Sequence, residues 1–304
     1  QFSSPLLSVK ASPDNPAQIG ELTQALQQLS EEDPSLDLEW LPVQRELHLK
    51  ISGMIQLEVL QASLMQRFDL KASFSPPNII YKETPLQSAF GYECYWMPKP
   101  CWAILKLKIE PGELGSGVHY ESQLSKNDIA AKYQNEIENI MPKALAQGIK
   151  GWQVTDLKIT LVEGEDHNVH TRPGDYLIAT PMAIMNGLKE AGTGLLEPIL
   201  AFSISAELDL LGDITSDITK MRGSFDSPQI NGNRFTIKGK VPAATSLEYP
   251  IQLASLSGGK AKLTTKLASY EPCILEQGET TEYRGVSPLD RDKWILQARG
   301  AIKS

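Results

Sequence analysis

The sequence predicts an α+β fold in which two sandwich domains flank a third unit of a different kind. One observation is an order of elements (strand, helix, strand, strand, helix, strand) that occurs in residues 1–85 and again in residues 195–287. A second is the middle segment, 86–194, where strands and helical stripes follow another order. The third is the length of 304 residues, which exceeds what a single hydrophobic core usually holds.

Residues 1–85 alternate between short apolar runs of strand character and stripes at helical spacing. The expected strands are Leu6–Ala11, Leu36–Trp40, Leu47–Ile51 and an extended segment over Leu70–Tyr81. One helix is expected from Pro16 to Glu31, because proline suits a first helical turn, and another is expected after Gly53. This order is the split βαβ arrangement of ferredoxin-like sandwiches.

Residues 195–287 repeat the arrangement, which predicts a second ferredoxin-like domain. The expected strands are Ile199–Leu208, Arg222–Ile230, Arg234–Val241 and Ala261–Ser269, and the expected helices are Leu211–Met221 and Ala244–Leu256. The turn NGN at 231–233 joins the two central strands. Residues 288–304 form a separate segment, in which a C-terminal helix is expected over Pro288–Lys303.

The middle segment, 86–194, predicts a mixed α+β unit. Trp102–Ile109 and Val154–Val162 alternate as half-buried strands do. Lys126–Gln147 is expected to be the longest helix of the chain, and Thr180–Ala191 to be a second helix. The polar segment Gly164–Tyr176, which reads GEDHNVHTRPGDY, then joins a strand to a helix at one end of the unit.

Charge argues against a general nucleic-acid binder, because the net charge is −8. The charge is uneven, however, and one stretch carries eight basic residues against Asp226 and Glu248. These eight are Lys220, Arg222, Arg234, Lys238, Lys240, Lys260, Lys262 and Lys266. A local basic surface can bind phosphates, since screening confines the acidic remainder to about 8–10 Å. A solvated strand face explains the same pattern equally well.

Several kinds of chemistry have no motif in this chain. There is no GxxxxGK[ST] phosphate loop and no GxSxG nucleophile turn, so no catalytic site is predicted. The three cysteines are scattered, which suits a reducing cytoplasm better than a disulfide framework. No apolar run reaches the roughly 18 residues of a membrane span, and no signal peptide opens the sequence. Because Gln1 already lies in strand-like sequence, we expect the chain to be cut from a longer one.

The segment GEDHNVHTRPGDY admits three interpretations. His167 and His170 could bind a metal with Asp166, Asp175 or the distant His119, but the spacing supplies no helical pair between Gly164 and Gly174. An acid/base centre would need a nucleophile, and none accompanies the histidines. A polar loop bounded by glycine and proline on a rigid element is a usual recognition device. No metal site is therefore predicted.

In order along the chain, these pieces resemble the C-terminal half of a translational GTPase of the elongation factor G superfamily. The motifs that carry the resemblance are EEDPSL (31–36), SGMIQLEVL (52–60), YKETP (81–85), LGSGVHYES (114–122), GWQVTDLKITL (151–161), LLEPI (195–199), GDITSDITKMRG (212–223) and KGKVPA (238–243). They fall in the third, fourth and fifth domains of that superfamily. The resemblance implies that the middle unit is ribosomal-protein-like, and that GTP and Mg²⁺ belong to an upstream domain and not to this fragment.

LGSGVHYES and AGTGLLEP (191–198) look most like the tetracycline-resistance ribosomal protection proteins. This resemblance implies a cytoplasmic, monomeric protein that binds the ribosome between its subunits and displaces tetracycline from the decoding site. The alternative is an elongation-factor-G-like paralogue acting in translocation or another ribosome step, because His167–Asn168–Val169 looks like that factor's His–Asp–Val. A free-standing enzyme that uses the two histidines is a third hypothesis.

The resemblance also implies which residues meet the ribosome. Two loops are expected at the tip of the fourth domain, and they consist of Leu114, Gly115, Ser116, Gly117, His167, Asn168, Val169, His170, Thr171, Arg172, Pro173, Gly174 and Asp175. Asn168 and Thr171 suit hydrogen bonds to base edges or 2′-hydroxyls, Arg172 suits phosphate, and the histidines suit stacking. A basic patch of Lys220, Arg222, Lys238, Lys240, Lys260, Lys262 and Lys266 is expected on ribosomal RNA.

Overall fold

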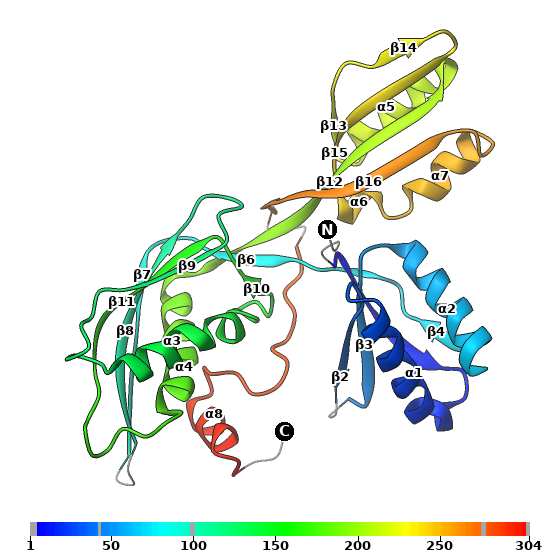
Figure 1. The fold of residues 1–304 in the computed structure, drawn as a ribbon. Helices are drawn as coiled ribbons and strands as arrows, with labels where there is room; N and C mark the ends of the chain where they lie inside the picture. Colours follow the sequence, from blue (N-terminus) through cyan, green and yellow to red (C-terminus); the bar gives the residue numbers. More distant parts are fainter. Residues whose placement is uncertain (1–4, 42–43, 98–100, 275–277, 302–304) are drawn as a thin grey trace. The chain divides into compact units, whose positions relative to one another are not determined.

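The computed structural model describes residues 5–41, 44–97, 101–274 and 278–301 (Figure 1). It confirms the α+β class. Contacts between residues divide the chain into two compact units, of which one combines 1–80 with 197–269 and the other combines 81–196 with 270–304. Residues from 270 onward thus join the middle unit, whereas domain boundaries after 85, 194 and 287 stay predictions.

The N-terminal sandwich has the ferredoxin-like order of strands. Its elements are β1 (Leu7–Pro13), a 3₁₀ turn η1 (Pro16–Gln18), α1 (Ile19–Glu32), β2 (Asp37–Leu41), β3 (Glu46–Ile51), α2 (Met54–Phe68), β4 (Ala72–Phe74) and β5 (Asn78–Ile79). The sheet runs β2-β3-β1-β4, with β5 also beside β1. Leu47, Leu49 and Ile51 alternate inward along β3 and are fully buried, as the pattern of period two predicts. The sequence also predicts a turn over Pro42–Arg45, of which residues 42 and 43 lie outside the described part of the chain.

The opposite face of this sheet carries polar side chains in ion pairs. Lys10 lies 2.6 Å from Glu46, which also meets His48 at 2.9 Å. Lys50 lies 3.3 Å from Asp37 on the neighbouring strand. The two lysines of this face are therefore matched by carboxylates.

The second sandwich repeats this layout. Its elements are β12 (Thr193–Glu207), η2 (Leu208–Leu210), α5 (Leu211–Lys220), β13 (Ser224–Phe225), β14 (Gln229–Asn231), β15 (Arg234–Pro242), α6 (Ala243–Ser246), α7 (Tyr249–Leu256) and β16 (Lys262–Pro272). The strand order is β16-β12-β15-β13, and β14 also pairs with β15. The predicted single helix Ala244–Leu256 is wrong, because α6 and α7 are separate. Pro250 lies in the first turn of α7, where its missing N–H costs no hydrogen bond.

The middle unit has a four-stranded sheet of order β7-β8-β11-β9. Its elements are β6 (Lys82–Pro85), β7 (Ala89–Met97), β8 (Cys101–Pro111), β9 (Val118–Ser122), α3 (Ala131–Ala144), β10 (Gln153–Val154), β11 (Leu157–Glu165), α4 (Asp175–Ala191) and α8 (Arg291–Ala298). Strand β8 is antiparallel to β7 and β11, whereas β9 is parallel to β11. One core joins inward residues of β8 and β11 to α3, α4 and Ile295 of α8.

Three helix predictions in this unit need correction. Helix α4 has 17 residues and α3 has 14, so Lys126–Gln147 is not the longest helix. The chain before α3 is held in a turn instead, since the Asp128 carboxylate accepts hydrogen bonds from the backbone and hydroxyl of Ser125. Helix α4 begins five residues earlier than the apolar stripe predicts. Helix α8 is shorter than predicted, and residues 302–304 lie outside the described part of the chain.

Hydrogen bonds and an ion pair hold the C-terminal segment, residues 281–298, against the rest of the middle unit. Gln147 exchanges two hydrogen bonds with the backbone of Arg284, at 2.9 and 3.0 Å. Trp294 donates its indole N–H to the carbonyl of Ile178 in α4 at 3.0 Å. Arg291 meets the buried Glu93 of β7 at 3.0 Å. Residues 281–298 are thus an integral part of this unit.

A buried carboxylate, Glu83 of β6, organises the start of β12. It accepts the backbone N–H groups of Lys150 and Trp152 at 3.0 and 2.8 Å and the hydroxyl of Thr193 at 2.8 Å. A Cβ atom at Gly148 would lie 2.4 Å from its carboxyl oxygen, so the glycine makes room for it. Burial raises the pKa of the Glu83 carboxyl, and the hydrogen bonds from Trp152, Thr193 and Lys150 oppose this in part.

This raised pKa predicts a pH dependence of stability. A carboxyl whose pKa is higher in the folded than in the unfolded protein stabilises the fold fully at pH values below its unfolded pKa of about 4.3. This contribution to stability is lost as the pH rises through the folded-state pKa. The side chain introduced by Glu83→Gln does not titrate. The urea midpoint of this variant should therefore rise relative to that of the parent as the pH increases from acid to neutral. The exposed Glu113→Gln serves as the control and should follow the parent. Parallel pH curves for parent and Glu83→Gln would contradict this account.

Candidate functional site

The loop of residues 166–174 connects β11 to α4 at one end of the middle sheet. The register pairs Glu165 at the end of β11 with Ile104 near the start of β8. The loop therefore lies beside Trp102 of β8, which is paired in turn with Trp96 of β7. Asn168, Val169 and His170 form an exposed turn, and Arg172 is exposed as well.

Thr171 anchors this loop to the sheet. Its hydroxyl donates to the carbonyl of Trp102 at 2.7 Å and accepts the backbone N–H of His167 at 2.8 Å. The side chain is 6% exposed. The expectation that Thr171 bonds RNA is therefore corrected, because its hydroxyl is used inside the protein.

Two carboxylates hold the end of the loop where α4 begins. Asp175 is buried and accepts the backbone N–H groups of Trp102 and Arg172 at 3.0 and 2.8 Å. Glu136 of α3 accepts the N–H of Gly174 at 2.9 Å, and burial raises the pKa of its carboxyl. Negative groups suit this position, since a helix N-terminus carries partial positive charge. Asp175 thus positions the loop and is not exposed to a partner.

A third carboxylate, Asp166, ties the loop to the start of α3. It accepts the backbone N–H of Ala130 at 2.9 Å, and Tyr133 donates its hydroxyl to the carbonyl of Thr171 at 3.2 Å. Of the three acidic residues next to the histidines, Asp166 and Asp175 therefore support the loop, whereas Glu165 is exposed. The loop is fixed on both sides, and its exposed turn projects from a rigid base.

Aromatic rings gather on the surface of this base. The rings of His167 and His170 stack with centroids 4.3 Å apart, and Trp102 lies 5.3 Å from His167. Trp96 stands edge-on to Trp102 at 6.3 Å and is 54% exposed. Nδ1 of His167 accepts the N–H groups of Val169 and His170, both at 3.2 Å, which shapes the turn. We call Trp96, Trp102, His167 and His170 the aromatic cluster.

Sequence reasoning missed Trp96 and Trp102 as members of this site. The signal that could have found them is their position in the sequence, since Trp96 ends one strand-like run, Trp102 begins the next, and cross-strand partners face each other. Both histidines lie in the loop that the sequence singles out, but their spacing does not predict that the two rings stack. Their tryptophan partners lie far away along the chain, on two other strands.

The second predicted loop, Leu114–Gly117, lies at the other end of the sheet. It follows β8 and precedes β9, where Leu157 pairs with both Pro111 and Val118. Because β11 runs from Leu157 to Glu165, its length separates the two loops. The expectation that both loops form one tip is corrected by this antiparallel register.

The Leu114–Gly117 loop is held by Asp156, a residue that the sequence did not single out. Its buried carboxylate accepts the N–H groups of Gly115 and Gly117 at 3.1 and 2.9 Å. Both glycines have positive φ, 79° and 74°, a conformation that other residues rarely adopt. Leu114 remains 55% exposed. The loop is thus rigid, with one apolar side chain presented to solvent.

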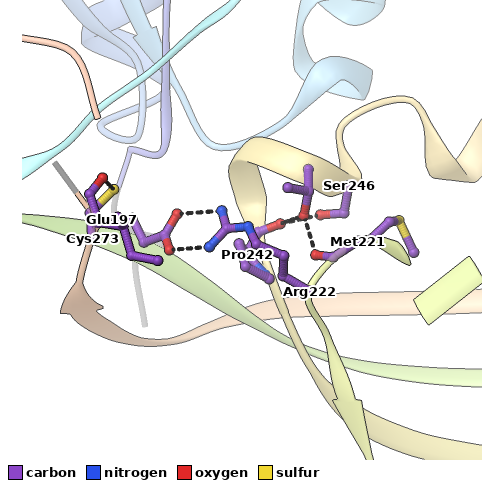
Figure 2. A network of polar contacts seen from close by, with 8 residues as sticks. Glu197, Met221, Arg222, Pro242, Ser246 and Cys273 are labelled. Atoms are coloured by element: carbon purple, nitrogen blue, oxygen red, sulfur yellow. Dashed lines mark hydrogen bonds and ion pairs between the residues drawn. The ribbon is translucent and has the colours of Figure 1, made fainter. Parts of the chain in front are cut away.

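The predicted basic patch divides in the structure. Arg222 forms a bidentate ion pair with Glu197, in which its two terminal guanidinium nitrogens donate to the two carboxylate oxygens at 2.9 and 3.1 Å (Figure 2). Hydroxyl groups nearby bond main-chain carbonyls, including that of Met221, which accepts from Thr245 at 2.6 Å. The Glu197 side chain is 5% exposed, so this pair belongs to the interior and Arg222 is removed from the patch.

The lysines of the patch fall into two groups. Lys220 on α5 and Lys260 before β16 are exposed next to Asp217 and Glu207. The remaining four are exposed on β15 and β16, and they are Lys238, Lys240, Lys262 and Lys266. Only this second group shares one sheet.

Two absences hold for the described residues only. Among them, no group of three or more His, Cys, Asp or Glu side chains is arranged to hold a metal ion. No helix in the described ranges is long and apolar enough to cross a membrane.

Comparison with known families defines the class of the protein. The family model "Elongation Factor G, domain III" matches residues 2–76, "Elongation factor G, domain IV" matches 77–192, and "Elongation factor G C-terminus" matches 194–280. The chain therefore belongs to the elongation factor G superfamily and contains these three domains in this order. The resemblance drawn from the motifs is confirmed.

Within that superfamily the chain is similar to tetracycline resistance proteins. It is 35% identical to TetP of Clostridium perfringens over 93% of this chain and 44% of that protein. It is 32% identical to TetW of Butyrivibrio fibrisolvens over 96% of this chain and 46% of that protein. A crystal structure from Thermus thermophilus shares the fold, with a TM-score of 0.71 and 26% identity over 99% of this chain and 44% of that one. The chain spans less than half the length of these relatives.

Proposed function

We propose that this chain is the ribosome-binding part of a tetracycline-resistance ribosomal protection protein. The observation that carries the proposal is the similarity to tetracycline resistance proteins over nearly the whole chain. In this proposal the exposed turn Asn168–His170 and the aromatic cluster reach ribosomal RNA at the decoding site and displace the drug. The protein acts in the cytoplasm as a monomer.

The chemistry of the turn supports contact with unpaired RNA. Aromatic rings stack on any splayed base, and such stacking contributes about 1–3 kcal/mol per base. Trp96 and His170 offer exposed rings, Asn168 offers an amide for base edges, and Arg172 offers a guanidinium for phosphate. Because Thr171, Asp175 and Asp166 already hold the loop, binding would require little ordering of the backbone.

The chain itself is proposed to be non-catalytic. Its sequence has no phosphate loop, so the purified chain should bind and hydrolyse no GTP. GTP, Mg²⁺ and ribosome-dependent hydrolysis belong in this proposal to a further domain of a longer protein.

A second function is favoured by one observation. His167–Asn168–Val169 resembles the tip of elongation factor G more than that of the protection proteins. An elongation-factor-G-like paralogue would therefore bind ribosomes and give no drug protection. Susceptibility of cells that express the full-length protein distinguishes the two.

The exposed turn provides the direct test. Asn168→Ser, Val169→Ser and His170→Ser combined should abolish protection against tetracycline in the full-length protein, as measured by drug susceptibility of expressing cells. The melting temperature of the chain should change by no more than about 2 °C, because exposed side chains contribute little to stability.

Leu114→Ser is the matched control, since it changes a similarly exposed side chain at the other end of the same sheet. It should leave protection intact. Full protection by the triple variant would refute the role of the turn, and absence of protection in the parent would favour the paralogue.

A further inference from the structure

The four-stranded sheet of the middle unit ends in two edge strands, β7 and β9. Side chains of the protein cover part of the edge at β7. Asn186 donates its amide N–H to the carbonyl of Tyr92 at 3.1 Å, and Arg291 donates to the carbonyl of Cys94 at 3.2 Å. These two carbonyls are acceptors that a further strand would need, so the edge at β7 is partly closed.

The backbone of β9 is open along its outer edge. The carbonyl of Gly117 accepts the N–H of Leu157, and the N–H of Gln123 donates to the carbonyl of Leu161. Since bonded residues alternate in a parallel pair of strands, the odd-numbered residues of β9 face β11. The backbone groups of the even-numbered residues point outward, and these residues are Val118, Tyr120 and Ser122. In the described part of the chain, none of these outward N–H and C=O groups has a hydrogen-bond partner.

A groove of about 330 Å³ lies beside this open edge. One side of its lining comes from β9 and the segment that follows, where Tyr120 and Leu124 also pack against the core of the unit. The other side comes from α3, through Ala131, Gln134, Asn135 and Glu138. Open strand edges are common, but an edge that faces a helix across a groove can hold an extended chain from two sides.

Two polar side chains on the helix side of the groove are free to bind a partner. Gln134 is already used, because it accepts the hydroxyl of Ser122 at 2.8 Å and donates to the carbonyl of Ile129 at 2.8 Å. Asn135 and Glu138 are exposed, and their side chains have no hydrogen bond or ion pair with any residue that the structure describes. The groove therefore offers an amide and a carboxylate.

The charge next to the open backbone groups is negative. The charged residues of the lining are Glu121, Lys126 and Glu138. Glu121 is neutralised by Lys158 at 2.8 Å, and Lys126 lies beyond the end of β9. Burial, followed by the charge of Glu138, raises the pKa of the Tyr120 hydroxyl to about 12, which places Glu138 near the middle of β9. The unpaired carboxylate of Glu138 thus suits a cationic group beside the strand.

We propose that the groove between β9 and α3 binds an extended polypeptide segment that carries a basic side chain. The segment adds to the sheet as a further strand, and its backbone bonds the outward N–H and C=O groups of β9. Its lysine or arginine meets Glu138. The three open residues span about 13 Å, at roughly 3.3 Å per residue, so about five residues of the partner are held.

This proposal goes beyond the proposed function, because its partner is a polypeptide and its site is not the exposed turn Asn168–His170. Unpaired negative charge disfavours a nucleic acid in the groove, since phosphates are bound by basic side chains. Rows of unpaired backbone donors and acceptors favour another backbone with the same spacing.

The test uses the 304-residue chain and a synthetic peptide. The peptide has about eight residues, with blocked ends, and alternates valine with threonine except for one central lysine, because these residues favour extended structure. Hydrogen exchange at single amides is the readout. The amides of Val118, Tyr120 and Ser122 should gain protection, whereas those of His119 and Glu121, which face β11, should not change.

Two N-methylated peptides test whether the backbone makes the contact. Methylation of every second N–H removes the donors on one side of the extended peptide and leaves those on the other side. One of the two alternate sets should weaken binding about tenfold or more, and the other should have little effect. Equal affinities of the two methylated peptides would refute addition of a strand.

Glu138→Gln tests the charge. It should weaken binding of the lysine peptide about two- to fivefold at low salt, as expected for an exposed ion pair. A peptide with norleucine in place of lysine should bind the parent and Glu138→Gln equally. Glu113→Gln, which removes an exposed carboxylate outside the groove, should bind the lysine peptide as the parent does.

Three results would overturn the proposal. One is unchanged exchange of the three outward amides at about 1 mM peptide, a concentration that detects even weak binding. Another is protection without the alternation between outward and inward amides. The third is a single-stranded RNA oligonucleotide that displaces the peptide at equal concentration, which would show an anionic partner. Since the test contains no ribosomes, each of these results leaves the proposed function standing.

Discussion

Replacement of Arg222 by alanine should lower the free energy of unfolding by about 3 kcal/mol. Removing one partner of a buried ion pair costs about 3–5 kcal/mol, because the other charge is left without compensation. The lower end applies here, since the Arg222 side chain is 34% exposed while that of Glu197 is 5% exposed. Urea denaturation followed by circular dichroism measures the change.

Lys220→Ala is the matched control, because it removes a basic residue that is 74% exposed and lies 3.9 Å from its nearest carboxylate. It should change stability by no more than about 0.5 kcal/mol. Replacing both partners, as in Glu197→Leu with Arg222→Met, should cost less than Arg222→Ala alone. Equal stability of Arg222→Ala and Lys220→Ala would restore Arg222 to the RNA-binding patch that the sequence predicted.

Asp175→Ala should destabilise the middle unit by about 2–4 kcal/mol. Under the proposed function, it should also abolish drug protection in the full-length protein. It leaves the N–H groups of Trp102 and Arg172 without their acceptor, and each unpaired buried group costs about 1–3 kcal/mol. The start of α4 also loses a favourable charge. Loss of function follows because the loop that carries His167 and His170 is no longer held against Trp102.

Hydrogen exchange is the specific readout, since the amides of Trp102 and Arg172 should lose protection before the core does. Glu165→Ala, an exposed carboxylate on the other side of the loop, should leave both amides protected. Unchanged amide protection in Asp175→Ala would show that the carboxylate does not hold the loop.

Element order was predictable from the sequence because local periodicity determines it. The alternation of Leu47, Leu49 and Ile51 and the helical stripe of α1 both appear in the structure where the pattern places them. The start of α4 was not predictable, since its first turn is specified by Asp175 and by Glu136 from another helix. The spacing of apolar residues along the sequence contains no information about either contact.

The site was predictable only in its local part. The stacked pair of His167 and His170 lies within one loop, so the sequence indicates their proximity. The supports of both loops include residues distant in sequence, namely Glu136 for the first loop and Asp156 for the second. In the sequence, a carboxylate that accepts backbone N–H groups looks like any surface carboxylate. Asp156 and Glu83 are examples, because their roles depend on burial that only the folded chain creates.

The bonded C-terminal segment has a consequence for biosynthesis. The core of the middle unit is built from residues of β8, β11, α3 and α4, yet it is completed by Ile295. At synthesis rates of about 5–20 residues per second, the residue that closes this core emerges about 5–20 s after the end of α4. During that interval the second sandwich, residues 197–269, can close around its own core, while the nascent middle unit still exposes the surface of α4 that α8 will cover. Until α8 is made, the middle unit therefore exposes apolar surface of the kind that chaperones bind.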